Sequence, residues 1–236
     1  RDIKVRYRQT LLGIAWALMQ PLAFMLIFTL VFSIVGGVGS EGTPYPLFSY
    51  TGLVPWTFFA TSVGLAVNSI AANMSLVKKI YFPREVFPIG AVLGCLTDFM
   101  VASMLVGGLM AWYRVPLSPN ILWLLWLVGI EVGLLMGISL FASAVNVFYR
   151  DVKYIVPLLI QLGMFVTPVI YSVSMVPERF QRWYMLNPMA VVIDGIRRVV
   201  LHGQPPPLQP LLMATGLVIA LLVAAYTYFK HVETKF

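Results

Sequence analysis

Residues 120–147 read NILWLLWLVGIEVGLLMGISLFASAVNV, a stretch in which Glu131 is the one charged side chain. About 20 consecutive apolar residues suffice for a helix to cross the hydrocarbon core of a bilayer, so this stretch predicts a membrane span. Gly129, Gly133 and Gly137 recur at every fourth position within it, a spacing that lets another helix approach closely. The fold class follows from this stretch and its equivalents elsewhere: we predict an all-α membrane protein.

The composition of the whole 236-residue chain has the same character. Its mean hydropathy is +0.88, and 11% of its residues are charged, against about 25% in soluble domains. The net charge of +7 would suggest nucleic-acid binding in a soluble protein, but in membrane proteins Lys and Arg gather in cytoplasmic loops. A single cysteine, Cys95, excludes a disulfide framework, and with only two histidines we expect no metal site.

Charge-poor stretches predict six transmembrane helices in one domain that covers residues 1–236. The predicted spans are residues 18–38, 56–77, 86–112, 120–147, 155–171 and 208–228. We interpret residues 42–55 as a loop, because they precede the second span and contain two prolines near their start. Three consecutive prolines at 205–207 mark the point where the last span can begin.

The orientation in the membrane follows from the Lys and Arg residues of the loops. Six spans place both termini on one side, and the basic residues on that side outnumber those on the other, so we expect both termini in the cytoplasm. The cytoplasmic set is Arg1, Lys4, Arg6, Arg8, Lys78, Lys79, Arg84, Arg150, Lys153, Lys230 and Lys235, and the external set is Arg114, Arg179, Arg182, Arg197 and Arg198. Because the first residue is Arg1, we expect the sequence to start inside a longer N-terminus, and it contains no visible signal-peptide cleavage site.

Two segments are too polar or too interrupted to be spans. Residues 1–15 place apolar side chains at helical spacing and predict an amphipathic interface helix; the alternation over residues 3–8 would also suit a strand, which would lack a partner at a membrane. Residues 172–207 form a long external segment with two predicted short helices, 177–186 and 189–201, interpreted as re-entrant or interfacial helices that cap the outer mouth. The alternative is a hairpin that lies on the outer leaflet.

Two acids, Asp98 and Glu131, fall inside predicted spans, where an ionised group costs about 2.5–3.5 kcal/mol on insertion scales. They could form a proton or cation site. The alternative is a protonated or hydrogen-bonded packing pair between adjacent helices, which is favoured because no third ionisable group continues a relay.

An aromatic row marks the first span. Its members recur at every fourth position: Trp16, Gln20, Phe24, Phe28 and Phe32. Aromatic faces suit stacking against sugar C–H groups and an amide suits hydrogen bonds to hydroxyls, so the row predicts a sugar path. Contact with lipid or with another helix is the alternative.

The predicted cytoplasmic loop at residues 78–85 is short, basic and aromatic. It reads Lys78, Lys79, Ile80, Tyr81, Phe82, Pro83, Arg84 and Glu85. Basic residues alone would anchor a loop at the membrane, but Tyr81, Phe82 and Pro83 place apolar bulk in water and indicate a protein contact. The sequence contains no GxxxxGK[ST] loop for ATP and no nucleophile paired with a base, so we do not expect an enzyme.

Six segments in a fixed order carry a resemblance to a known family. They are RDIKVRYRQTLLGIAWALMQP at residues 1–21, GLVPW at 52–56, KIYFPR at 79–84, NVFYRD at 146–151, TPVIY at 167–171 and LNPM at 186–189. Together they resemble the permease subunit of polysaccharide-exporting ATP-binding-cassette (ABC) transporters, with the strongest likeness to O-antigen exporters. The resemblance spans the whole chain.

This resemblance implies partners and roles that the residues alone do not establish. It implies a homodimer bound to two separate ATPase subunits, which hold ATP and Mg and leave this chain without a cofactor, in the inner membrane of a bacterium. The cargo would be a polysaccharide on undecaprenyl pyrophosphate, and residues 78–85 would couple to the ATPase. By charge, Lys4, Arg6 and Arg8 are candidate pyrophosphate contacts. Phe165 and Tyr171 would join the aromatic row in the sugar path, and the external gate would contain Arg179, Trp183, Tyr184, Asn187, Asp194, Arg197 and Arg198.

Other functions stay open at this point. Capsule and teichoic-acid exporters share the same expected architecture. A proton-driven secondary transporter would use Asp98 and Glu131 but requires internal repeats, which the two halves of the sequence do not show. A membrane-embedded sugar-lipid enzyme would need an acid or base at the aqueous edge, where Glu85 and Asp151 both have basic neighbours.

Overall fold

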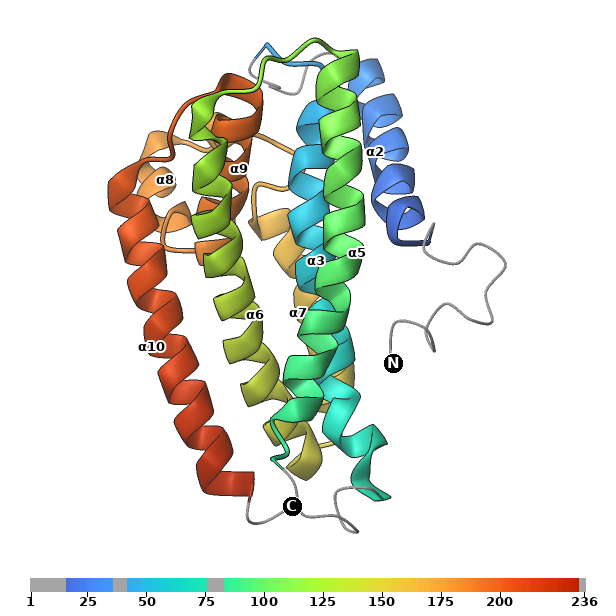
Figure 1. Ribbon diagram of the computed structural model, residues 1–236, viewed down its shortest axis with the longest axis vertical. Helices are drawn as coiled ribbons and strands as arrows, with labels where there is room; N and C mark the ends of the chain where they lie inside the picture. Colours follow the sequence, from blue (N-terminus) through green and yellow to red (C-terminus); the bar gives the residue numbers. More distant parts are fainter. Residues whose placement is uncertain (1–15, 36–41, 76–82, 234–236) are drawn as a thin grey trace.

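The computed structural model describes residues 16–35, 42–75 and 83–233, and within these ranges the chain is entirely helical with connecting loops (Figure 1). Four helices are long and apolar enough to cross a membrane: α3 (Tyr45–Ala72), α5 (Val86–Trp112), α6 (Trp123–Phe148, preceded by the 3-10 turn η2, Pro119–Leu122) and α10 (Leu208–Val232). Shorter helices complete the chain: α2 (Trp16–Val35), α7 (Val152–Val166), α8 (Glu178–Tyr184) and α9 (Pro188–His202), with η3 (Val173–Met175) before α8. The all-α prediction is confirmed, with four long candidate spans.

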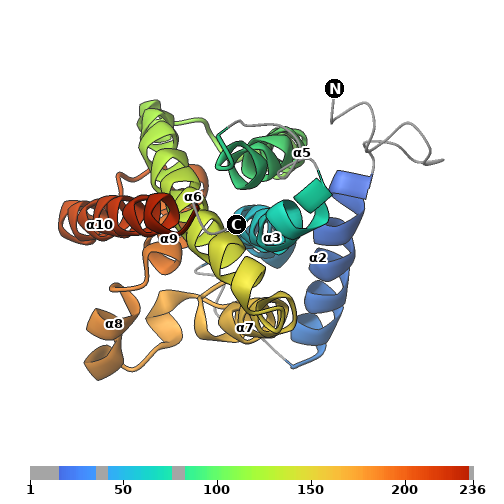
Figure 2. The same cartoon turned by 90° about the horizontal axis from the view of Figure 1, so that it is seen from below.

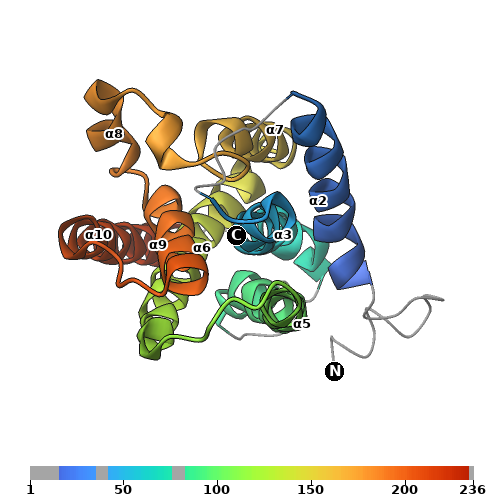
Figure 3. The same cartoon turned by 90° about the horizontal axis from the view of Figure 1, so that it is seen from above.

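The long helices run side by side, and α3 occupies the centre of the bundle (Figure 2). It packs against α2, α5, α6, α7 and α9, and α10 packs against α6 and α9. In Figure 1 the upper end of the bundle carries the start of α3 and the end of α5, and the lower end carries the end of α6 and the start of α7. Seen from above, α9 lies between α10 and α3, while α8 stands apart at the edge (Figure 3).

Helix α3 begins earlier than its sequence predicts. The interpretation of residues 42–55 as a loop is wrong from Tyr45 onward, because the helix starts there and continues through Pro55. Pro46 lies in the first turn, where the missing N–H is not needed and the fixed φ suits a helix start. The prolines that suggested a loop therefore mark the beginning of the most buried of the four long helices, in which Leu47, Tyr50 and Leu53 are fully buried.

Helix α7 is shorter than the predicted fifth span. It ends at Val166, whereas the prediction extended to Tyr171. Thr167 is extended, with ψ 141°, because the residue that precedes a proline is disfavoured in the helical region. The backbone of residues 167–171 is therefore a non-helical turn, and Thr167, Val169 and Ile170 within it are buried.

The two short helices predicted in residues 172–207 are present as α8 and α9. Most of α9 is buried, Ala190 and Ile193 completely, and Gly195 faces Leu127 of α6 so closely that a Cβ there would meet its Cδ2 at 2.7 Å. A hairpin lying on the outer leaflet would leave an apolar face free for lipid, so that alternative is wrong for α9.

The glycines of α6 allow the close helix approach that their spacing predicts at two of three positions. A Cβ on Gly133 would meet Val218 at 2.9 Å and one on Gly137 would meet Leu221 at 3.1 Å, both on α10. At Gly129 the space is open. The contact between α6 and α10 thus depends on the lower two glycines.

Candidate functional site

Arg197 of α9, one of the predicted gate residues, is buried inside the protein. Its side chain is 4% exposed, and its guanidinium crosses to the non-helical turn that follows α7. Nη1 donates hydrogen bonds to the backbone oxygens of Pro168 (2.6 Å) and Tyr171 (3.0 Å), and Nη2 donates to that of Val169. Non-helical backbone at membrane depth is tolerated only where its polar groups are satisfied inside the protein, and Arg197 supplies the donors.

The same guanidinium touches α3. It stacks on the ring of Phe48, 3.8 Å from the centroid. Gly52 leaves room for it, because a Cβ there would collide with Nη2 and stand 2.5 Å from the backbone oxygen of Val169. The glycine of the GLVPW segment is thus explained by the close approach of Arg197 and of the turn after α7.

Two further hydrogen bonds close this junction. The hydroxyl of Tyr45 donates to the backbone oxygen of Ile170 (3.0 Å), and Nδ2 of Asn187 donates to Oγ1 of Thr167 (3.1 Å). Asn187 also caps α9, since its Oδ1 accepts a hydrogen bond from the N–H of Met189 (3.0 Å). Three of the segments that carry the family resemblance, at 52–56, 167–171 and 186–189, therefore meet at one point, which we call the arginine junction.

An aromatic ladder leads from α2 to the arginine junction. Successive ring centroids lie 6.1 Å apart between Phe24 and Phe28, 6.2 Å between Phe28 and Phe32, and 5.4 Å between Phe32 and Tyr45. The next step, from Tyr45 to Phe48, is 6.2 Å and ends under Arg197. Phe28 and Phe32 are half-buried against the protein core, so the packing alternative applies to their inner faces.

The other predicted sugar-path residues divide into exposed and linked positions. Gln20, Phe24 and Phe165 are exposed, Phe165 to 60%. Tyr171 is half-buried; its hydroxyl donates to the backbone oxygen of Phe165 (2.9 Å) and shares a short hydrogen bond with the hydroxyl of Tyr184. Trp16 starts α2, but its side chain lies outside the described part of the molecule.

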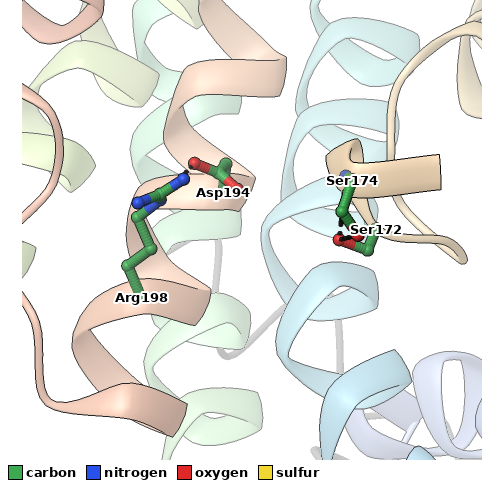
Figure 4. A network of polar contacts seen from close by, with 4 residues as sticks. All are labelled: Ser172, Ser174, Asp194 and Arg198. Atoms are coloured by element: carbon green, nitrogen blue, oxygen red, sulfur yellow. Dashed lines mark hydrogen bonds and ion pairs between the residues drawn. The ribbon is translucent and has the colours of Figure 1, made fainter. Parts of the chain in front are cut away.

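Four of the seven predicted gate residues line one cavity of about 1300 Å³ between α8, α9 and the start of α10. Its lining includes Arg179, Trp183, Asp194 and Arg198, joined by Glu178, Gln181, Gln209 and the Ser174 turn. Figure 4 shows two polar contacts near its wall: Nε of Arg198 lies 2.7 Å from a carboxylate oxygen of Asp194, and the Ser174 hydroxyl donates to that of Ser172 (2.9 Å). We call this space the upper cavity; Tyr184, Asn187 and Arg197 do not line it.

At the lower end, the last residue of the predicted coupling loop is tied to the last long helix. Lys230 of α10 lies 2.8 Å from a carboxylate oxygen of Glu85 and 3.1 Å from one of Glu233. Burial raises the pKa of Glu85, but the hydrogen bond and the charge of Lys230 outweigh burial and hold that pKa below its usual value. Pro83 is exposed and Arg84 is half-buried.

Several predicted site residues lie outside the described ranges. These are the coupling residues Lys78, Lys79, Ile80, Tyr81 and Phe82, the pyrophosphate candidates Lys4, Arg6 and Arg8, and the whole predicted interface helix at residues 1–15. Their predicted roles stay predictions.

The two intramembrane acids do not form a hydrogen-bonded pair with each other. Glu131 is fully buried in α6, and neither of its carboxyl oxygens has a hydrogen-bond partner among the described residues. Asp98 is half-buried on α5. No cluster of His, Cys, Asp and Glu that could hold a metal ion occurs in the part of the chain that the structure describes.

Sequence reasoning missed three residues that join elements. Tyr45 and Phe48 were assigned to a loop. A helix that begins at Tyr45 would have brought both rings into the row of the α2 phenylalanines. Asn146, in the NVFYRD segment, donates from Nδ2 to the backbone oxygen of Val67 (3.0 Å) and accepts a hydrogen bond from the N–H of Lys153 (3.1 Å). A lone amide in an apolar helix was the available signal, because a buried amide needs partners.

The bundle of long apolar helices and the buried non-helical turn between them are the features of a multi-pass membrane protein. The sequence matches the model of the ABC-2 type transporter family over residues 1–201, and the chain belongs to that family. It is therefore a membrane permease subunit of a bacterial ABC exporter, a transport component and not a catalytic one.

The chain is also similar to individual proteins that are named for O-antigen export and for polysialic acid transport. The chain is 31% identical over 240 residues to the O-antigen export system permease protein RfbA of Myxococcus xanthus, across 100% of this chain and 91% of that protein. It is 33% identical to the protein of the same name from Klebsiella pneumoniae, across 86% of this chain and 78% of the relative. The polysialic acid transport protein KpsM of Escherichia coli is 24% identical, across 86% and 79%.

Proposed function

We propose that this chain is the permease of an ATP-driven exporter that moves a polysaccharide linked to undecaprenyl pyrophosphate, an O-antigen, across the inner membrane. Two copies form the conduit, and each binds one ATPase subunit on the cytoplasmic side, where both termini lie. The observation that carries this proposal is the full-length similarity to an O-antigen export permease at 31% identity.

The geometry of the aromatic ladder supports a sugar cargo. Phe24 presents an exposed ring at one end of a row that continues to Tyr45. The exposed Phe165 and Gln20 add an apolar and an amide contact. Rings that are partly exposed offer weak, repeated stacking contacts, and a conduit needs sites that hold a cargo without trapping it. Six membrane spans are part of the proposal, with α2 and α7 as the first and fifth.

The second part of the proposal concerns coupling. Residues 78–85 contact the ATPase, and Lys230 holds the end of this loop through Glu85. ATP binding in the partner would shift the loop, separate the first and fifth spans of the two protomers, and let the polymer pass toward the upper cavity, which serves as the external gate.

A transport assay in cells tests the proposed cargo. The chain is produced together with its ATPase subunit in bacteria that synthesise an O-antigen polymer but lack their own permease. Polymer on the cell surface is the expected result, and it should vanish when the ATPase carries a hydrolysis-inactive substitution. Polymer that stays inside although the complex assembles in the membrane would refute O-antigen export.

The same assay separates the other candidates. Capsule or teichoic-acid export would appear as rescue in cells that make those polymers and not in O-antigen cells. A proton-coupled transporter would work with the inactive ATPase and stop when an uncoupler dissipates the proton gradient.

Coupling has its own test at two aromatic residues. Tyr81→Ala combined with Phe82→Ala should abolish export and ATPase stimulation, while the variant still inserts in the membrane and dimerises. Unchanged export together with unchanged stimulation would remove residues 78–85 from the coupling role.

A further inference from the structure

A second, smaller cavity opens at the lower end of the bundle and shares no lining residue with the upper cavity. Its volume is about 370 Å³, and it lies between the end of α3, the end of α6 and the start of α7. It is lined by Asn68, Ala71, Ala72, Met74, Asn146, Val147, Arg150 and Lys153. We call it the lower cavity.

The described lining of the lower cavity is basic and contains no acidic residue. Arg150 and Lys153 are both exposed, and neither forms a salt bridge with a carboxylate in the described ranges. The ammonium of Lys153 lies 4.8 Å from the ring centroid of Tyr154, a contact that does not neutralise its charge. Two cations that share a cavity repel each other, and a bound anion would relieve that repulsion.

The polar wall of the lower cavity is held in place. Asn146 is 2% exposed, and its amide group bridges the backbone of Val67 on α3 and of Lys153 at the start of α7. The backbone that carries Lys153 is therefore fixed relative to α3 and α6 before any ligand arrives, which lowers the entropy cost of binding. Asn68, on the α3 side, is exposed and adds amide donors on the opposite wall.

We propose that the lower cavity binds a phosphate-containing anion, either the diphosphate head of a lipid in the membrane or a free phosphate compound. An arginine binds phosphate oxygens in pairs and a lysine adds a compact point charge, and the amides supply neutral donors. If the ligand is a lipid, its identity as the exported cargo rests on the proposed function. The binding of phosphate does not depend on that function. A volume of this size fits one small anion and not a folded partner surface.

Binding can be measured without transport. The purified permease is reconstituted in nanodiscs of phosphatidylcholine and titrated with inorganic pyrophosphate at low salt by isothermal calorimetry. The test variant combines Arg150→Gln with Lys153→Gln, and a charge-matched control combines Arg114→Gln with Arg182→Gln, two cations that the sequence predicts on the external side and outside the gate set. Loss of one charge-assisted contact should weaken binding about tenfold or more, so the test variant should bind pyrophosphate about 100-fold more weakly and the control as the wild type does.

The source of the phosphate is separated by a second arm. Nanodiscs that contain undecaprenyl diphosphate should block the pyrophosphate titration of the wild type if the ligand is a lipid head, and leave it unchanged if the ligand is a free compound; phosphatidylglycerol serves as the anionic-lipid control. Absence of pyrophosphate binding to the wild type, or equal binding to the test variant, would overturn the proposal. If the test variant bound pyrophosphate as the wild type does but no longer associated with the ATPase subunit, the proposal would also be overturned, and Arg150 and Lys153 would be assigned to a protein contact. A failure of the export assay would leave these titrations intact and would count against the cargo alone.

Discussion

The arginine junction predicts that two neighbouring arginines differ sharply in their contribution to stability. Arg197 is 4% exposed and donates three hydrogen bonds to backbone oxygens, whereas the side chain of Arg198 is 43% exposed and pairs with Asp194 four residues away. Arg197→Met keeps most of the side-chain volume but leaves three backbone oxygens without these donors, two of them in buried hydrogen bonds. Each buried acceptor left unsatisfied costs about 1–3 kcal/mol, so we expect a total loss of about 3–5 kcal/mol. Arg198→Gln should cost less than about 0.5 kcal/mol, the range of an exposed pair of this spacing.

The chain carries its own reporter for this comparison. Cys95 is its single cysteine and is 1% exposed, so a thiol-reactive fluorophore in detergent reacts only when the core opens. At about 2–4 °C per kcal/mol for a domain of this size, Arg197→Met should lower the melting temperature by about 6–20 °C. Arg198→Gln should leave it within about 2 °C, and Arg197→Lys, which keeps the charge but loses the planar fork, should fall between the two. A melting temperature of Arg197→Met equal to that of Arg198→Gln would refute the structural role of the junction.

Three further predictions use the same thiol assay, with export as a second readout where stated. Gly52→Ala should destabilise the protein by about 1–3 kcal/mol, because the new methyl group collides with the side chain of Arg197 and with the backbone oxygen of Val169. Gly64→Ala on the same helix places its methyl group within 4 Å of nothing and should be neutral or slightly stabilising. Equal melting temperatures of the two variants would contradict this prediction. Asn146→Leu should cost about 1–3 kcal/mol for its two interhelical hydrogen bonds, and a melting temperature at the wild-type value would show that they contribute nothing. Glu85→Lys should impair export, and the added Lys230→Glu should restore it. Because the folded pKa of Glu85 is lowered, the pair stabilises the protein above the ordinary glutamate pKa of about 4.3, and this stabilisation is lost as the pH falls through the lowered pKa. A melting temperature that changes between about pH 6 and 8 because of this pair would contradict the assignment.

The long helices were predictable because their signal is simple. Lipid demands long apolar stretches, and helix α5 has the bounds Val86–Trp112 that the charge-poor stretch predicts. Boundaries failed where proline was interpreted by its usual role in loops. The start of α3 at Tyr45 uses Pro46 as a first-turn residue, a distinction that depends on what packs around the helix and not on the local composition.

The candidate site was only partly predictable, because the position of a side chain on a helix does not reveal which residues it contacts in the folded protein. Arg197 and Arg198 are adjacent and were assigned the same role, yet one inserts into the protein and the other lines the upper cavity. The short helix predicted at residues 189–201 is present as α9, but a helix buried on nearly all sides can also enclose an arginine when a neighbouring turn offers carbonyl groups. That turn becomes visible only once α7 is seen to end at Val166.

Helix α7 is fastened at both of its ends. Asn146 holds the backbone at Lys153 to α3 and α6 at the start of the helix, and Arg197 holds the turn beyond Val166. A helix that is held by hydrogen bonds at both ends has no hinge of its own. Helix α7 can therefore move relative to its neighbours only if one of these two sets of hydrogen bonds breaks. Any large motion of this helix must therefore carry the central helix with it. In the proposed dimer, the seam along which the assembly parts is then expected to run between the two bundles and not through the middle of one.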